Sequence, residues 1–280
     1  MAKKIKVALK LLISLALVYF VIKQIDYNRL IELLKGSNTL YLALAFVLFN
    51  ISKILSSIRL NLYFKEIGIN LVEKKNLILY YVGMFYNLFL PGGIGGDGYK
   101  AYLLKKRYNT KVAPILKALF FDRVSGLLAL IFLATTLFIF SQYAISPLKY
   151  IAIFIAIAIY PIFYLVVKRY KIFMQYFNKT TMLAFLVQSF QLFSAIAIIY
   201  ALPKSAPLIE FLVLFLISSV VAVLPITIGG VGVRELTFLY GLNYIGISAD
   251  VGVAFSFLFF LITMLSSLIG VLFLHKPMGN

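Results

Sequence analysis

Two stretches of the sequence combine a proline, a cluster of glycines and a terminal basic side chain. One runs from Pro91 to Lys100, and the other runs from Pro225 to Arg234. Glycine lets backbone amides come close to a ligand, and a helix that restarts after the break presents free N–H groups and the positive end of its dipole. Such a stretch is suited to cradle an anion, for example a lipid phosphate, with Lys100 or Arg234 supplying the charge.

The two stretches follow one pattern. Leu90 aligns with Leu224, an offset of 134 residues that is close to half of the chain, and six of eleven aligned positions are identical, with a basic residue last in both. The alternative is a chance likeness between two helix breaks rich in Pro and Gly. The aligned Leu, Ile and terminal base favour an internal repeat.

Acidic side chains accompany these bases in apolar surroundings. Asp97 lies within the first glycine cluster, Glu235 follows Arg234, and Asp122 and Arg123 stand between two long apolar runs. Ionisable residues at membrane depth are expensive and usually mark function. The candidate ligands of a lipid head group are therefore Gly92, Gly93, Gly95, Gly96, Asp97, Lys100, Asp122, Arg123, Gly229, Gly230, Gly232, Arg234 and Glu235, with Pro91 and Pro225 as helix breaks.

A structural role for the same charges is the alternative. Asp97 would then pair with Arg123, and Arg234 would pair with Glu235 or Asp122, to hold the chain in place. Three other charged residues are expected to be structural. Lys53 and Arg59 lie near the predicted end of a helix and should snorkel toward the interface, and Glu210 suits the positive end of a helix dipole.

The composition shows what kind of element must position these residues. Hydrophobic residues make up 63% of the 280 residues and charged residues 13%, with a mean hydropathy of +1.01. Soluble chains have roughly 45–50% apolar and about 25% charged residues. We therefore predict an all-α integral membrane protein. The net charge of +18 fits basic loops on the cytoplasmic side better than nucleic-acid binding.

Metal, thiol and cofactor chemistry find little support in the composition. The sequence has no cysteine, one histidine and nine acidic residues. Disulfides and thiolate chemistry are excluded, and we expect neither a metal centre nor a cofactor.

Six segments are long and apolar enough to cross a bilayer, which needs about 20 residues. A short amphipathic helix at Tyr27–Lys35 suits the headgroup layer. The predicted spans are 5–22, 39–58, 118–141, 148–167, 180–200 and 251–274.

Two further apolar runs, 77–90 and 208–224, are short and end in the Pro/Gly stretches. We predict re-entrant hairpins at about 77–106 and 208–245, because broken backbone inside a bilayer must be buried in protein or line a wet space. With the N-terminus inside, this topology places 20 basic residues on the cytoplasmic side and six outside. A crossing at the first hairpin would strand the most basic stretch, 100–117, outside.

This topology makes residues 1–280 a single membrane domain with two halves, 1–140 and 141–280. Both termini are cytoplasmic, and the hairpins enter from opposite leaflets and meet near the midplane. This is the arrangement of an inverted-topology repeat.

Three stretches resemble a known family. LPGGIGGDGYKAY at 90–102, FDRVSGL at 121–127 and PITIGGVGVRE at 225–235 are similar to the signature stretches of the lysylphosphatidylglycerol synthase transmembrane, or flippase-like, family, and 25–34 is similar too. The resemblance implies a bacterial or archaeal inner-membrane protein that moves a lipid head group between leaflets. The best-known members also carry a cytoplasmic aminoacyl-transferase domain, for which we expect no room in this chain.

The first functional hypothesis is a translocase for an anionic phospholipid or a polyprenyl-phosphate-linked lipid, and not an enzyme. Lys100, Arg123 and Arg234 would neutralise the phosphate, and an acid such as Asp97 would carry a coupling proton. No GxxxxGK[ST] nucleotide-binding loop is present.

Two alternatives remain open. One is a membrane-embedded lipid-modifying enzyme that uses Asp97, Asp122 and Glu235 as acid/base groups, although no nucleophile–His pair supports it. The other is a scaffold for a separate synthase or glycosyltransferase, which would dock on the basic face.

Overall fold

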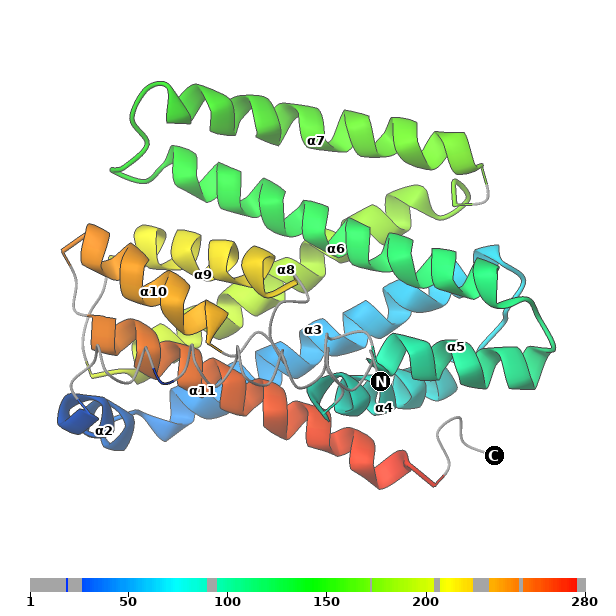
Figure 1. The fold of residues 1–280 in the computed structure, drawn as a ribbon, viewed down its shortest axis with the longest axis horizontal. Helices are drawn as coiled ribbons and strands as arrows, with labels where there is room; N and C mark the ends of the chain where they lie inside the picture. Colours follow the sequence, from blue (N-terminus) through cyan, green and yellow to red (C-terminus); the bar gives the residue numbers. More distant parts are fainter. Residues whose placement is uncertain are drawn as a thin grey trace.

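The computed structural model describes residues 19, 27–89, 95–171, 173–203, 207–223, 232–246 and 249–275. Throughout this part of the chain the fold is helical and contains no strand (Figure 1). The predicted first span, 5–22, lies outside the described residues except for Tyr19. So do both prolines and four glycines of the predicted site, namely Pro91, Pro225, Gly92, Gly93, Gly229 and Gly230.

Five long apolar helices run side by side along the long axis of the molecule (Figure 1). Each has 23 to 28 residues, which at about 1.5 Å per residue exceeds the roughly 30 Å of a hydrocarbon core. Five of the six predicted spans coincide with these helices, and the chain is a multi-pass membrane protein. The helices are α3 (Thr39–Glu66), α6 (Val112–Ile139), α7 (Leu148–Tyr170), α8 (Phe177–Ala201) and α11 (Ala249–Leu268), the last continued by a 3-10 turn, η1 (Ile269–Phe273).

Two pairs of shorter helices lie at opposite ends of this bundle (Figure 1). Their lengths of 12 to 17 residues give about 18–26 Å, less than a full crossing. In each pair the two helices pack on one another. The first pair is α4 (Glu73–Phe89) and α5 (Gly95–Tyr108), and the second is α9 (Leu208–Val223) and α10 (Val233–Tyr244).

The helices of the two halves correspond in order. Adding 134 to the bounds of α3, α4, α5 and α6 gives the bounds of α8, α9, α10 and α11–η1 to within four residues. The contacts correspond as well, because α6 packs on α9 as α11 packs on α4, and α3 packs along α8 between the halves. The hydroxyl of Ser194 donates to the Ala45 carbonyl at 2.8 Å, so small side chains let α3 and α8 approach closely.

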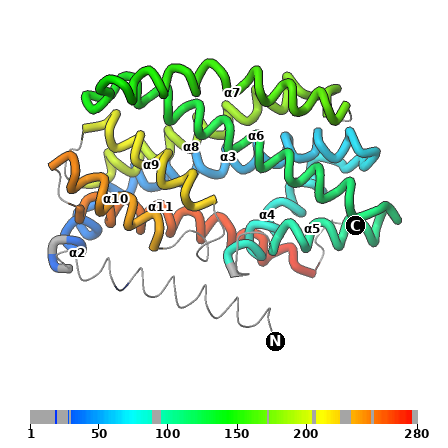
Figure 2. Tube along the Cα trace, turned by 45° about the horizontal axis from the view of Figure 1, so that its top comes forward, coloured from blue at the N-terminus to red at the C-terminus, as the bar shows by residue number. Residues whose placement is uncertain are grey.

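Two helices stand apart from this correspondence. Helix α7 lies at the edge of the bundle against α6 (Figure 2), and most of its surface is apolar and exposed. Helix α2 (Tyr27–Lys35) confirms the short helix expected there and packs on α11.

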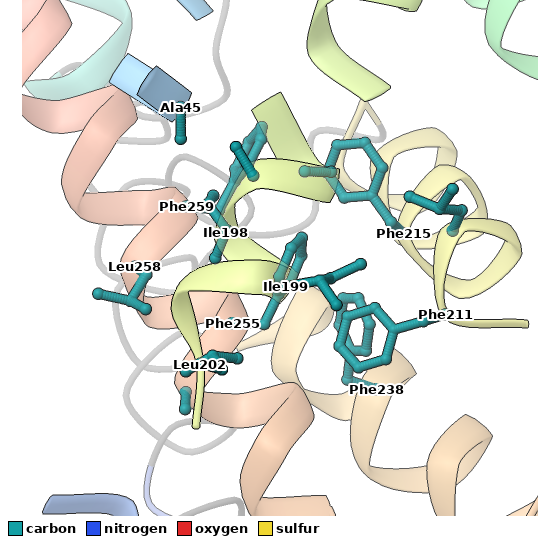
Figure 3. Packing of buried hydrophobic residues seen from close by; sticks show 14 of the residues in the cluster. Ala45, Ile198, Ile199, Leu202, Phe211, Phe215, Phe238, Phe255, Leu258 and Phe259 are labelled. Atoms are coloured by element: carbon teal, nitrogen blue, oxygen red, sulfur yellow. The ribbon is translucent and has the colours of Figure 1, made fainter. Parts of the chain in front are cut away.

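Aromatic side chains fill the core where α8, α9, α10 and α11 meet (Figure 3). Phe211 lies 5.0 Å from both Phe238 and Phe255, and Phe215 lies 5.0 Å from Phe259, measured between ring centroids. Aromatic pairs at this spacing each add about 0.5–1.5 kcal/mol beyond burial. This cluster fixes α10, and with it Arg234, against α9 and α11.

Candidate functional site

An ion cluster joins the first short pair to α6. Asp97 of α5 accepts hydrogen bonds from Lys100 Nζ at 3.2 Å and from Arg123 Nε of α6. Asp97 and Lys100 are buried, with 7% and 5% of their surface exposed. The predicted pairing of Asp97 with Arg123 is therefore confirmed, and Asp97 also pairs with Lys100.

The glycines of this pair bring the helices into backbone contact. A Cβ on Gly96 would stand 1.9 Å from the carbonyl oxygen of Gly83, and a Cβ on Gly83 would meet Cε of Lys100 at 2.4 Å. The stem of Lys100 therefore crosses α4 over Gly83 and places Nζ 4.8 Å from the ring centroid of Tyr80. The amide of Gly96, a predicted ligand of the head group, donates to Asn87 Oδ1 at 2.8 Å instead.

The charge of Asp97 is stabilised by its neighbours. Burial raises the pKa of Asp97, but Lys100 and Arg123 outweigh burial and hold that pKa below its ordinary value. Helix α5 is not one of the five candidate spans. A carboxyl group with a lowered pKa stays ionised near neutral pH, so Asp97 is poorly suited to carry a coupling proton.

A second buried ion pair ties α3 to α6. Arg59 Nε lies 2.8 Å from Asp122 Oδ1, and both residues are buried. The expectation that Arg59 snorkels to the interface is wrong, because α3 continues to Glu66 and a carboxylate faces the guanidinium. The alternative pairing of Arg234 with Asp122 is also wrong, since Asp122 binds Arg59.

Arg234, in the first turn of α10, lies over aromatic rings. Its guanidinium carbon is 4.6 Å from the ring centroid of Phe259 and 5.7 Å from that of Phe215. The expected pair with Glu235 is not formed, because Glu235 Oε2 accepts from the Gly232 amide at 2.6 Å and caps α10. Within the described chain, the buried Nη1 of Arg234 has no hydrogen-bond partner.

Lys53 shares this aromatic surface, and the prediction that it snorkels from a helix end is wrong. Its Nζ lies 4.3 Å from the ring centroid of Phe49, and Phe49 packs edge-on against Phe259 at 5.6 Å. Lys53 lies near enough to Arg59 and Arg234 for their positive charges to repel its own. It stands in the middle of α3, so its ammonium is too far from either helix end to snorkel. The signal in the sequence that could have identified Lys53 is a single basic residue with an apolar run on either side.

The basic residues therefore divide into those that have a carboxylate partner and those that have none among the described residues. Arg59 has a carboxylate partner, and Lys100 and Arg123 share one. Neither Lys53 nor Arg234 makes an ion pair with any residue that the structure describes. Two cations in apolar surroundings without a counter-ion are costly, and a bound anion would offset that cost.

The remaining predicted site residues contribute less. Gly95 opens α5, and Gly232 precedes α10 with a φ of +86°, a conformation that glycine adopts without strain. The described ranges contain no group of His, Cys, Asp or Glu arranged to hold a metal ion.

These features define a polytopic helical membrane protein that keeps ionic side chains in its interior beside two half-length helix pairs. The chain belongs to the family described as the lysylphosphatidylglycerol synthase TM region, whose profile matches residues 7–270. The resemblance seen in the sequence is thereby confirmed. The chain is also 26% identical over 147 residues to a UPF0104 membrane protein of Methanocaldococcus jannaschii. That match covers 52% of this chain and 43% of the relative, so this chain spans less than half of the relative's length.

Proposed function

We propose that the protein is a translocase that moves an anionic lipid between leaflets of the inner membrane and holds its phosphate at Lys53 and Arg234. The observation that carries the proposal is the pair of unneutralised cations on the Phe49–Phe259–Phe215 surface. Hydrogen bonds between charged groups and a phosphate are worth about 1.5–3 kcal/mol each. Family membership supports a lipid as the source of that phosphate.

The proposed path uses the two short helix pairs as re-entrant hairpins of an inverted repeat, with halves at 1–140 and 141–280. Three observations support it: the pairs are too short to cross, they lie at opposite ends of the bundle, and their helices correspond between the halves (Figure 1). Hairpins that enter from opposite leaflets would meet near the midplane. The head group would pass there while the acyl chains stay in lipid.

The ion clusters receive different roles in this proposal. Asp97, Lys100 and Arg123 hold the first hairpin on α6, and Arg59 with Asp122 holds α3 on α6. These bases already have carboxylate partners and position the helices, in contrast to the proposed phosphate ligands Lys53 and Arg234. Without a nucleotide-binding loop, transport runs downhill or on an existing gradient.

The alternative of a lipid-modifying enzyme receives no support from the geometry. Its three candidate acid/base groups are all engaged, Asp97 and Asp122 in ion pairs and Glu235 in a helix cap. We place both termini in the cytoplasm, following the distribution of basic residues. A separate synthase that supplies the lipid would meet the basic end of α5, where Lys105, Lys106 and Arg107 are exposed.

The test is transport in phosphatidylcholine vesicles that contain a trace of fluorescent phosphatidylglycerol. Lys53→Gln and Arg234→Gln each remove one charge, and we expect at least a tenfold slower exchange between leaflets, because a charge-assisted contact is lost. Lys65→Gln is the matched control, since Lys65 lies on the same helix and pairs at the surface with Glu73. Wild-type protein that moves the lipid no faster than empty vesicles would contradict the proposal.

A further inference from the structure

Three polar atoms on α3, α7 and α8 are buried without a hydrogen-bond partner among the described residues. They are Nη1 of Arg59 on α3, Oε1 of Gln188 on α8 and the hydroxyl of Tyr160 on α7, and none of them finds a partner within the described ranges. Arg59 and Gln188 are 5% and 6% exposed. Leaving such groups unsatisfied costs about 1–3 kcal/mol each, so an occupant that bonds to them is favoured.

Gly126 on α6 lies beside two of these residues, Arg59 and Gln188. A Cβ at Gly126 would stand 3.2 Å from Arg59 Nη1, so the guanidinium lies directly over this glycine. Gln188 Nε2 donates to the Gly126 carbonyl at 3.1 Å, which fixes the amide and leaves Oε1 as an acceptor. Tyr160 interacts electrostatically with Arg59, and its ring lies 4.8 Å from Phe185, one helical turn before Gln188.

The hydrogen-bonding character of this cluster identifies its ligand chemistry. Arg59 offers a donor, Gln188 an acceptor, and Tyr160 a hydroxyl that does both. Because Asp122 already neutralises Arg59, the cluster has no net charge to attract an anion. Hydroxyl groups carry no charge and both donate and accept hydrogen bonds, so the hydroxyls of a lipid head group match this cluster.

We propose that Arg59, Gln188 and Tyr160 form a subsite for the hydroxyl groups of a glycerol or sugar head group. The inference rests on the proposed function, because the phosphate of the same lipid would lie at Lys53 and Arg234. Lys53 interacts electrostatically with Arg59 and precedes it by six residues on α3, a rise of about 9 Å. That separation suits a phosphate and the far hydroxyls of the group it carries.

The test measures binding of short-chain lipids to the purified full chain in detergent. Phosphatidic acid presents the phosphate alone, phosphatidylglycerol adds a glycerol, and phosphatidylinositol adds a ring of hydroxyls. Tyr160→Phe removes one hydroxyl without changing the ring. We expect it to weaken both hydroxylated lipids about 3- to 10-fold, as for one lost hydrogen bond, and to leave phosphatidic acid unchanged. Gln188→Met should act in the same direction.

The control variant is Tyr164→Phe, on the same helix but 40% exposed, which should change no affinity. Equal affinities of the wild type for all three lipids, or equal losses for all three in Tyr160→Phe, would overturn the subsite and leave a cluster filled by water. Because binding is measured without transport, the two proposals fail separately. A protein that discriminates hydroxylated lipids but moves none keeps the subsite and loses the translocase.

Discussion

At the scale of single residues, the partner of each buried charge decides its role. Asp97 pairs with two basic residues, Asp122 pairs with one, and the carboxylate of Glu235 caps helix α10. Lys53 and Arg234 remain without a carboxylate among the described residues and rest on aromatic rings. A cation over an aromatic face is stabilised by about 0.5–2 kcal/mol. This reduces the free-energy cost of burying the cation when no ligand is bound, but it does not neutralise the charge.

Asp97→Asn tests the first of these roles. The substitution leaves Lys100 and Arg123 without their shared counter-ion, and removing one partner of a buried pair costs about 3–5 kcal/mol. The side chain of Arg123 is more than a third exposed, so water screens its charge. We therefore expect the free energy of unfolding to fall by about 3 kcal/mol. The unfolding midpoint in detergent should fall. Glu32→Gln, on the exposed face of α2, should leave the midpoint unchanged.

The same carboxyl group predicts how stability depends on pH. The pKa of Asp97 is lowered in the folded state, so its contribution is complete above the ordinary value of about 4 and is lost as the pH falls through the lower folded value. The difference in midpoint between wild type and Asp97→Asn should therefore be constant from pH 8 to about pH 5 and shrink below about pH 4. A difference that vanishes near neutral pH would contradict this account.

At the scale of helices, hydropathy and glycine placement predicted most of what the structure shows. Five of the long apolar runs coincide with candidate spans, and the two short apolar runs, 77–90 and 208–224, coincide with most of α4 and with α9. The predicted end of α3 at residue 58 was wrong, because Arg59 and Asn61 look like the start of a loop. The structure buries both, Arg59 against Asp122 and Asn61 against Glu73 Oε1 at 2.7 Å.

The pairings themselves were not predictable from the sequence. Arg59 and Asp122 are 63 residues apart, and only the packing of α3 on α6 shows that they meet. The same holds for Lys53 and Arg234, which lie in different halves of the chain. Composition predicts that a buried charge needs a partner, but the partner depends on helix rotation, which many weak packing contacts determine together.

The contact between α4 and α5 can be tested with two neighbouring glycines. Gly96→Ala would drive a methyl group into the Gly83 carbonyl, which is backbone and cannot move aside, so we expect loss of folded protein. At Gly98, on the same helix, an added Cβ meets nothing within 4 Å. Gly98→Ala should keep the fold and stabilise it by up to about 1 kcal/mol through helix propensity. The monodisperse yield after gel filtration in detergent and the unfolding midpoint measure both effects, and an undamaged Gly96→Ala protein would exclude the close contact.

At the scale of the whole molecule, the corresponding halves explain why the two cationic regions differ. In the alignment at an offset of 134, Lys100 corresponds to Arg234, but Asp97 corresponds to Val231. Lys100 therefore has a counter-ion on its own helix, α5, whereas the position that corresponds to Asp97 offers Arg234 none. In the proposed inverted repeat, one basic position is then structural and the other is left to bind a ligand.

The proposed opposite orientation of the two short helix pairs leads to the last prediction. Asn109 and Asn243 are separated by the repeat offset of 134, and both are exposed beside the outer ends of α5 and α10. Because the protein has no cysteine, Asn109→Cys and Asn243→Cys each introduce a unique thiol. With re-entrant hairpins from opposite leaflets, an impermeant thiol reagent should label Asn109→Cys only in inside-out vesicles and Asn243→Cys only in right-side-out vesicles. Labelling of both positions from one side would mean that one pair of short helices crosses the membrane, and the inverted repeat would be lost with it.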